Sequence, residues 1–138
     1  MVIMRQIFPY AETTGGITVR VAPRYLPEQS DPERHYFVWA YHVRVENHTE
    51  NPVQLLARHW IITDGHGRID EVEGDGVVGV QPLIQPGGAY DYVSGCPLPT
   101  RHGLMHGRYF MQGSDGEQFA VTIPAFSLEM PDSKPSVH

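Results

Sequence analysis

The stretch HYFVWAYHVRVEN, residues 35–47, alternates apolar and polar side chains with a period of two. Successive side chains of an extended chain point to opposite faces of a sheet, so residues two apart share a face. The stretch therefore predicts a β-strand with one face on a core and most of the other face in water. The inward-facing side chains would be those of Phe37, Trp39, Tyr41, Val43 and Val45.

The same period recurs on both sides of this stretch. Apolar residues alternate with polar ones over residues 17–21 and 118–123, whereas VQLLARHWIITD, residues 53–64, is more continuously apolar, as a central strand would be. Asp-Gly pairs within 64–67 and 114–117 predict hairpins, because both residues tolerate positive φ. Together these signals predict an all-β fold, an antiparallel β-sandwich. Its strands are expected near 16–25, 35–46, 53–63, 68–73, 77–84, 89–94, 104–112 and 117–128.

Length and composition indicate a globular chain of one domain. We expect that domain over residues 1–130 of the 138 and a disordered tail over 131–138. The formal net charge of −6 repels a phosphate backbone and predicts no nucleic-acid partner. A single cysteine, Cys96, forms no internal disulfide and fits a reducing compartment. Because neither a signal peptide nor an apolar membrane span is expected, the chain is expected to be cytoplasmic.

The glycines of EGDGVVG, residues 73–79, have the G-x-G-x-x-G spacing of dinucleotide-binding loops. In such a loop a helix follows the glycines and its N-terminus meets the pyrophosphate. Here the next residues are two valines, a glycine, a third valine and, at position 82, a proline, which favour a strand. We therefore interpret Gly74, Gly76 and Gly79 as a bend between strands. Its backbone amides could still form a small anion-binding nest, with Arg58 and Arg101 as the candidate cationic contacts.

Eight histidines and a run of acidic residues raise the question of a metal site. His102 and His106 are four residues apart, about 13 Å on a strand, too far to share one zinc ion. The acidic run is the better cation candidate, since hard cations take oxygen ligands, although a solvated charged hairpin is the alternative interpretation. Its weak candidate ligands are Asp70, Glu71, Glu73 and Asp75.

Several motifs of the sequence resemble the ApaG family. They are RHW-ITD-G within residues 58–65, G-GVVG-QP within 74–82 and IP-F-L within 123–128, and the resemblance extends over about 17–128. It implies a fibronectin type III-like (immunoglobulin-like) sandwich and no established catalytic residues. The chain departs from the family at Val80, where an acidic residue is expected.

The resemblance also implies functions. The family takes its name from a gene that neighbours a diadenosine tetraphosphate hydrolase, and some members are linked to cobalt resistance and magnesium efflux. Related domains in F-box proteins and in a polymerase-delta-interacting protein look like protein-binding modules. We therefore expect a non-catalytic binding domain, without cofactor, that recognises a protein partner or a small ligand. An anion-binding sensor at the glycine bend and a role in divalent cation homeostasis are the alternatives, and a homo-oligomer is compatible with each.

Overall fold

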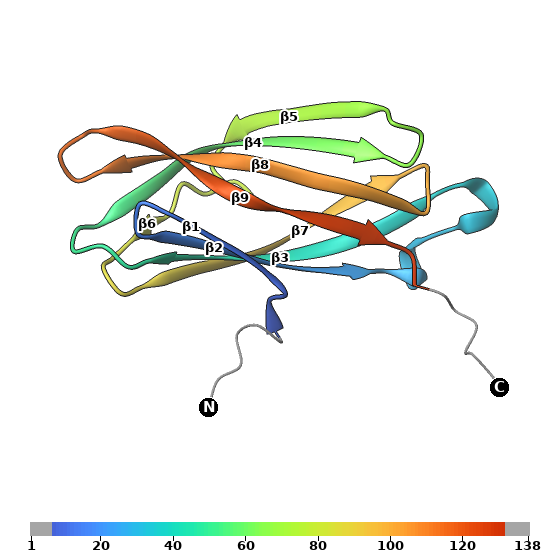
Figure 1. Ribbon diagram of the computed structural model, residues 1–138, viewed down its shortest axis with the longest axis horizontal. Coiled ribbons are helices and arrows are strands. Elements are labelled where there is room, and N and C mark those ends of the chain that lie inside the picture. The colour runs from blue at the N-terminus through green and yellow to red at the C-terminus, as the bar shows by residue number, and fades with distance from the viewer. Residues whose placement is uncertain (1–6, 132–138) are drawn as a thin grey trace.

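Two antiparallel sheets pack face to face in the computed structural model, which describes residues 7–131 (Figure 1). The first sheet has the strand order β1-β2-β3-β7, and the second has the order β5-β4-β8-β9, with β6 paired to β4. The prediction of an antiparallel β-sandwich is therefore confirmed. The strands are β1 (Tyr10–Thr14), β2 (Ile17–Tyr25), β3 (Phe37–Asn47), β4 (Val53–Asp64), β5 (Ile69–Asp75), β6 (Leu83–Ile84), β7 (Ala89–Leu98), β8 (His102–Gly113) and β9 (Gln118–Glu129).

The core lies between the sheets and is built from the alternating faces that the sequence predicts. In β3 the odd-numbered side chains from Phe37 to Val45 are all buried, because they point at the opposite sheet. The ring of Trp60 in β4 packs edge-on against Tyr41, Tyr109 and Phe126. Aromatic pairs favour this edge-to-face arrangement, which adds to the hydrophobic free energy of burial.

One predicted strand is wrong in its first half. Residues 77–80 form a tight two-residue turn, and only Leu83–Ile84 of the expected 77–84 strand joins a sheet. Val77 and Val80 exchange backbone hydrogen bonds of 2.8 and 3.0 Å, while Val78 and Gly79 both have positive φ. The three valines favour extended backbone, but Val78 and Gly79 adopt the left-handed conformations that close the turn, and Gly76 just before it also has positive φ.

The structure also bears on the predictions for the first strand, the hairpins and the tail. Strand β1 was not predicted; it pairs with β2 from Tyr10↔Val21 to Thr14↔Ile17. The 64–67 and 114–117 hairpins are present, closed by Asp64 N–H to Arg68 O and by Gly113 N–H to Glu117 O. Apart from Pro131, the tail that was predicted to be disordered falls outside the described residues. The likeness to fibronectin type III or immunoglobulin domains and the single-domain boundary at 130 stay predictions.

The two long sides of the sandwich differ. On one side β1 lies against β9, where Thr122 N–H donates to Thr14 Oγ1 and Ser127 N–H to Tyr10 Oη. On the other side the outer strands are β5 and β7, which do not pair with each other (Figure 1). We call this second side the open side. Both of its outer strands keep one backbone edge free of strand partners among the described residues.

Candidate functional site

A cleft of about 460 Å³ lies on the open side, between β7 of the first sheet and β4 and β5 of the second. Its floor is the aromatic core at Tyr41 and Trp60, and Arg58 brings a positive charge to its wall. Concave sites with apolar walls and a few polar groups are the usual places for small ligands. The remaining lining side chains that carry polar groups are those of Asp70, Glu71, Ser94 and Cys96.

The Arg58 side chain forms hydrogen bonds with the backbone of the glycine bend. Its Nη1 donates hydrogen bonds of 2.9 Å to the backbone carbonyls of Asp75 and Gly76. Gly74 lies against the guanidinium: a Cβ at this position would come within 2.9 Å of Nη2. The absence of a side chain at Gly74 therefore leaves space for the Arg58 guanidinium. The carbonyl groups that Arg58 contacts accept hydrogen bonds, so they do not provide donors for an anion.

Arg101 does not join Arg58 at the glycine bend. Gly74 pairs with Arg58 in the middle of β4, whereas Arg101 lies in the turn before β8, which begins beside Asp64 at the end of β4. The structure thus brings Gly74, Gly76 and Arg58 together and places Arg101 away from them, at an end of the second sheet. Gly79 belongs to the tight turn beyond them.

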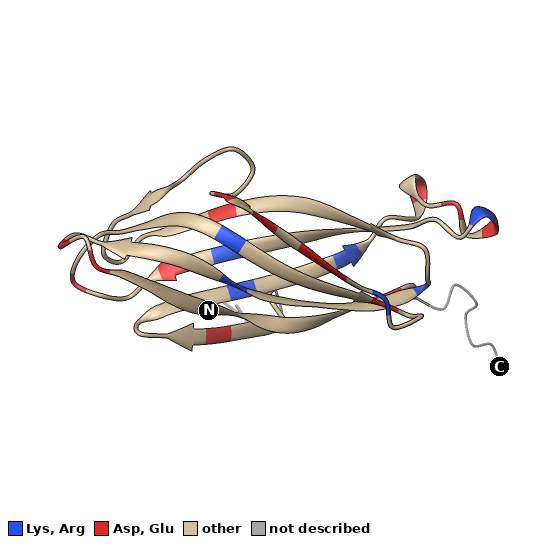
Figure 2. Ribbon diagram, turned by 90° about the horizontal axis from the view of Figure 1, so that it is seen from above, with Lys and Arg blue, Asp and Glu red and all other residues tan. Residues whose placement is uncertain are grey.

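The acidic residues of β5 are divided between two faces. Asp70 and Glu71 both contribute to the lining of the open-side cleft, but the Asp70 side chain lies on the inner face of β5, whereas the Glu71 carboxylate is directed toward His59. Glu71 and Glu73 lie on the outer face of the second sheet with His59 of β4, and the acidic residues follow each other along this edge strand in Figure 2. His59 Nε2 lies 2.8 Å from Glu71 Oε1 and 3.6 Å from Glu73 Oε2. Asp75 shares their parity but lies outside this group.

Sequence reasoning grouped the four acidic residues and missed His59 as their partner. His59, Glu71 and Glu73 are the one group of three ligand-bearing side chains within 4.8 Å of each other among residues 7–131. The His59 side chain is only 12 % exposed, so its ring is held in place, while both glutamates are exposed. The pairing His59↔Glu73 creates the group, and only the register of β4 against β5 sets that pairing.

Two buried groups line or underlie the cleft without an obvious reactive role. Burial, and to a smaller extent the charge of Asp70, raises the pKa of the Cys96 thiol to about 11. The hydroxyl groups of Tyr92 and Tyr109 form a hydrogen bond with each other. Burial raises the pKa of both tyrosines, so both stay neutral and the pair serves as a structural link between the sheets.

The outer face of the first sheet carries a charge network that the sequence pattern did not reveal. Glu46 accepts hydrogen bonds from Arg20 and Arg44 and contacts His48. Burial by itself raises the pKa of Glu46, but the hydrogen bonds from Arg20, His48 and Arg44 outweigh it and lower the pKa from 4.5 to about 2. Arg44 also bonds Asp91 of β7, so the network ties three strands together.

Comparison with known proteins decides the family. The model of the ApaG domain matches residues 27–113. The chain belongs to the ApaG family. It is 54 % identical to Protein ApaG of Paramagnetospirillum magneticum over 129 residues, 94 % of this chain and 99 % of that one. It is 51 % identical to Protein ApaG of Brucella suis over 125 residues, 91 % of this chain and 96 % of the other.

An ApaG relative of known structure has the same architecture. A Bordetella pertussis protein, solved by crystallography under the name ApaA, superposes with a TM-score of 0.82 at 50 % identity, covering 90 % of this chain and 98 % of that one. The ApaG domain model spans β3 to β8 and so contains Arg58, the glycine bend and both outer strands of the open side. Within residues 7–131, no helix is long and apolar enough to cross a membrane.

Proposed function

We propose that this ApaG domain is a non-catalytic, cytoplasmic binding domain that receives a protein segment or a small ligand on its open side. The observation that carries the proposal is the cleft between β5 and β7, two outer strands that each keep one backbone edge unpaired within residues 7–131. An outer strand presents backbone N–H and C=O groups that an extended peptide can pair with. The cleft beside it offers pockets for the peptide's side chains or room for a small molecule.

Exposed apolar side chains on the same two strands support the proposal. Ile69 and Val72 of β5 and Val93 of β7 are 61 %, 40 % and 58 % exposed. Apolar surface near free backbone edges favours association, because binding removes both from water. The chemistry around the cleft supports binding rather than turnover: the pKa of its thiol is raised, whereas nucleophilic cysteines have a lowered pKa.

Amide hydrogen exchange of the domain, measured with and without a captured partner, tests this proposal. We expect a pull-down from cell extract to yield a protein partner, and the complex to slow amide exchange in β5 and β7. Val72→Lys should weaken capture, because it places a charge on the edge of the cleft, whereas Leu104→Lys is a matched control on the other face of the second sheet. Protection confined to other strands, or robust hydrolysis of a dinucleoside polyphosphate by the pure protein, would overturn the proposal.

A second candidate function is divalent cation handling, as in cobalt or magnesium homeostasis, and the His59–Glu71–Glu73 group favours it. Tetrahedral ligands bonded at about 2.0–2.1 Å are separated by about 3.3–3.5 Å from each other. The separations of 2.8 and 3.6 Å from His59 Nε2 to the two carboxylates are close to that requirement. A mixed nitrogen and oxygen set suits Co²⁺ or Zn²⁺ better than Mg²⁺, which prefers oxygen ligands.

Calorimetry with Co²⁺, Zn²⁺ and Mg²⁺ tests the cation hypothesis. Binding of one ion should be lost in Glu71→Gln and in Glu73→Gln. It should be kept in Asp70→Asn, which removes the same charge from the same hairpin but faces the cleft. Equal loss in all three variants would mean general attraction to the acidic hairpin and would exclude a defined site.

Anion sensing at the glycine bend is the alternative that the geometry supports least. One nitrogen of Arg58 already donates to two carbonyls of the bend, and Arg101 lies at the far end of the sheet. Pyrophosphate or ATP should leave the backbone amide signals of residues 74–79 unshifted in NMR spectra. A saturable shift there would restore the anion-sensor hypothesis.

A further inference from the structure

A second hollow, of about 400 Å³, lies at the end of the sandwich where three connections meet. The turn after the 3-10 element η2 (Pro32–Arg34) contributes His35, and the β4–β5 hairpin contributes His66. The β7–β8 turn contributes Arg101, and the first residue of β8 is His102. The connections at one end of a β-sandwich are where such folds place ligand-binding residues. We call this hollow the end pocket.

The end pocket gathers basic side chains in an otherwise acidic protein. Three histidines and one arginine line it, and no carboxylate does, although the chain has 16 acidic residues against 10 lysines and arginines. Elsewhere in the described residues His42, His48 and His59 each contact a carboxylate. The end-pocket histidines and Arg101 have no ion pair and no side-chain hydrogen bond within residues 7–131, so their donors are available to a ligand.

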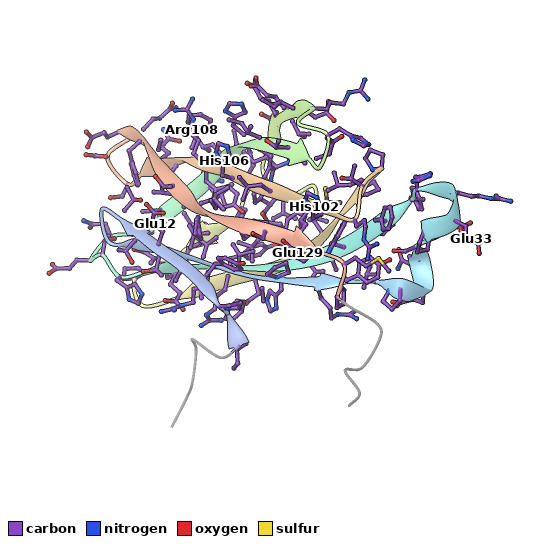
Figure 3. The ribbon with its side chains drawn as sticks, turned by 45° about the vertical axis from the view of Figure 1, so that its right-hand side comes forward. Glu12, Glu33, His102, His106, Arg108 and Glu129 are labelled. Carbon is purple, nitrogen blue, oxygen red and sulfur yellow. The ribbon has the colours of Figure 1, made fainter. Side chains whose placement is uncertain are left out.

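The acidic residues nearest in sequence or register to the end pocket do not line it. Asp64 is buried, and its Oδ1 accepts hydrogen bonds from the backbone N–H groups of His66 and Arg68. Glu129 is the strand partner of His102, beside which it lies in Figure 3, but the two form no ion pair and Glu129 does not line the pocket. Asp31 and Glu33, which flank Pro32, do not line the pocket either, and Asp31 Oδ2 lies 3.6 Å from Arg34 Nε. The permanent charge among the lining residues is therefore the positive charge of Arg101.

Hydrogen bonds hold the connections of the end pocket in place before any ligand arrives. Thr100 Oγ1 accepts a bond of 2.8 Å from Gly65 N–H and donates one of 2.8 Å to His102 O. The His102 ring lies against Gly65, where a Cβ would come within 3.0 Å of it. Met130 N–H donates to Arg101 O and ties the end of β9 to the same turn. A site assembled in advance loses less conformational entropy on binding.

We propose that the end pocket binds a small organic anion, a phosphate monoester or a carboxylate with an apolar body. Arg101 would bind the anionic oxygens through its guanidinium fork, and the imidazole N–H groups of His35, His66 and His102 would complete the donor set. Phe37, Pro32, Pro99 and Met130 line the pocket and would cover the apolar body. This site is distinct from the open-side cleft, and its test does not depend on the proposed function.

An NMR titration of the full chain with phenyl phosphate tests the proposal. We expect saturable shifts at the backbone amides of residues 35–37, 65–66 and 100–102, with a roughly millimolar dissociation constant for a ligand of this size. Inorganic phosphate should shift the same amide signals but bind the pocket more weakly, because it lacks the apolar body. Benzyl alcohol, which has the ring without the charge, should cause no saturable shift there.

Two arginine variants make the titration decisive. Arg101→Ala should weaken phenyl phosphate binding about tenfold or more, since a charge-assisted, forked contact is lost. Arg108→Ala removes the same charge from the outer face of the second sheet, where Arg108 lies over the Phe110 ring, and should bind as the parent does. The proposal fails if phenyl phosphate gives no saturable shift, shifts residues 74–79 instead, or loses affinity equally in both variants.

Discussion

Gly76 lies so close to Val80 that a methyl group on its α-carbon would overlap the Val80 carbonyl oxygen. Gly76 also has φ of +60°, a conformation that side chains other than hydrogen disfavour. Gly79 has φ of +79°, but nothing lies within 4 Å of the Cβ position there. Two glycines of one motif are thus under different constraints, one from space and backbone angle, the other from backbone angle alone.

Alanine substitutions should separate these two constraints. Gly76→Ala should lower the free energy of unfolding by about 3 kcal/mol or more, because the new methyl group forces the bend away from Val80. Gly79→Ala should cost only about 1 kcal/mol, the strain of a positive φ. Urea denaturation of both variants measures the difference. Equal losses of unfolding free energy would show that the close approach of Gly76 to Val80 does not restrict which residue position 76 accepts.

Val78 should be a site where substitution stabilises the protein. It has φ of +48°, which β-branched residues rarely adopt, and its side chain is 63 % exposed, so it gains little from burial. Val78→Asn or Val78→Gly should raise the free energy of unfolding by about 1 kcal/mol, since both residues accept this turn conformation. Thermal denaturation provides the measurement. A fall in melting temperature for both variants would contradict the prediction.

Glu46 should make stability depend on acid pH. Its folded-state pKa of about 2 lies below the ordinary value of 4.5, so its contribution is present above pH 4.5 and is lost as pH falls toward 2. Glu46→Gln should therefore lower the free energy of unfolding by about 2 kcal/mol near neutral pH, and this loss should shrink as the pH falls from 4.5 to 2. Denaturant unfolding at several pH values measures it.

Glu12 of β1 provides the control for this prediction. It is exposed and forms no ion pair within the described residues, so Glu12→Gln should change stability little at any pH. A cost for Glu46→Gln that stayed constant from pH 7 to pH 2 would show that shape, not charge, explains it.

Cys96 should react slowly with alkylating reagents. A thiol with pKa of about 11 has roughly 100-fold less thiolate at pH 8 than one with the ordinary value of 9.0, and burial hinders approach as well. We expect iodoacetamide to label the folded protein at least that much more slowly than the protein in concentrated urea, as followed by mass spectrometry. Similar rates in both states would mean that the cleft opens readily at Cys96.

The Tyr92–Tyr109 pair should show strong coupling. Tyr92→Phe leaves the Tyr109 hydroxyl fully buried without its partner and should cost about 1–3 kcal/mol, and Tyr109→Phe should cost a similar amount. The double variant removes both hydroxyls and should cost clearly less than the sum of the two single costs. Unfolding free energies of the four proteins complete the cycle. Simple additivity would contradict a hydrogen bond between the two.

Local signals predicted most of the strands and the hairpins, and they failed where two local signals conflicted. Residues 77–80 illustrate the conflict, because three valines favour a strand and the neighbouring glycines favour a turn. The turn prevails since Val77 is buried in the core, Gly76 packs against Val80, and no side-chain preference for extended backbone offsets both. Strand β1 has weak alternation and is held mainly by its pairing with β2.

The amino-acid sequence by itself determined which side chains face the core, because alternation along an extended chain is a local property of the backbone. Only the tertiary structure decided which of the outward-facing groups meet. His59 reaches Glu71 and Glu73 through the register of β4 and β5, and Arg101 lines one pocket with three histidines where distant connections converge. Those arrangements depend on strand order and on which sheet edges close, and both are set by packing between residues far apart in the chain.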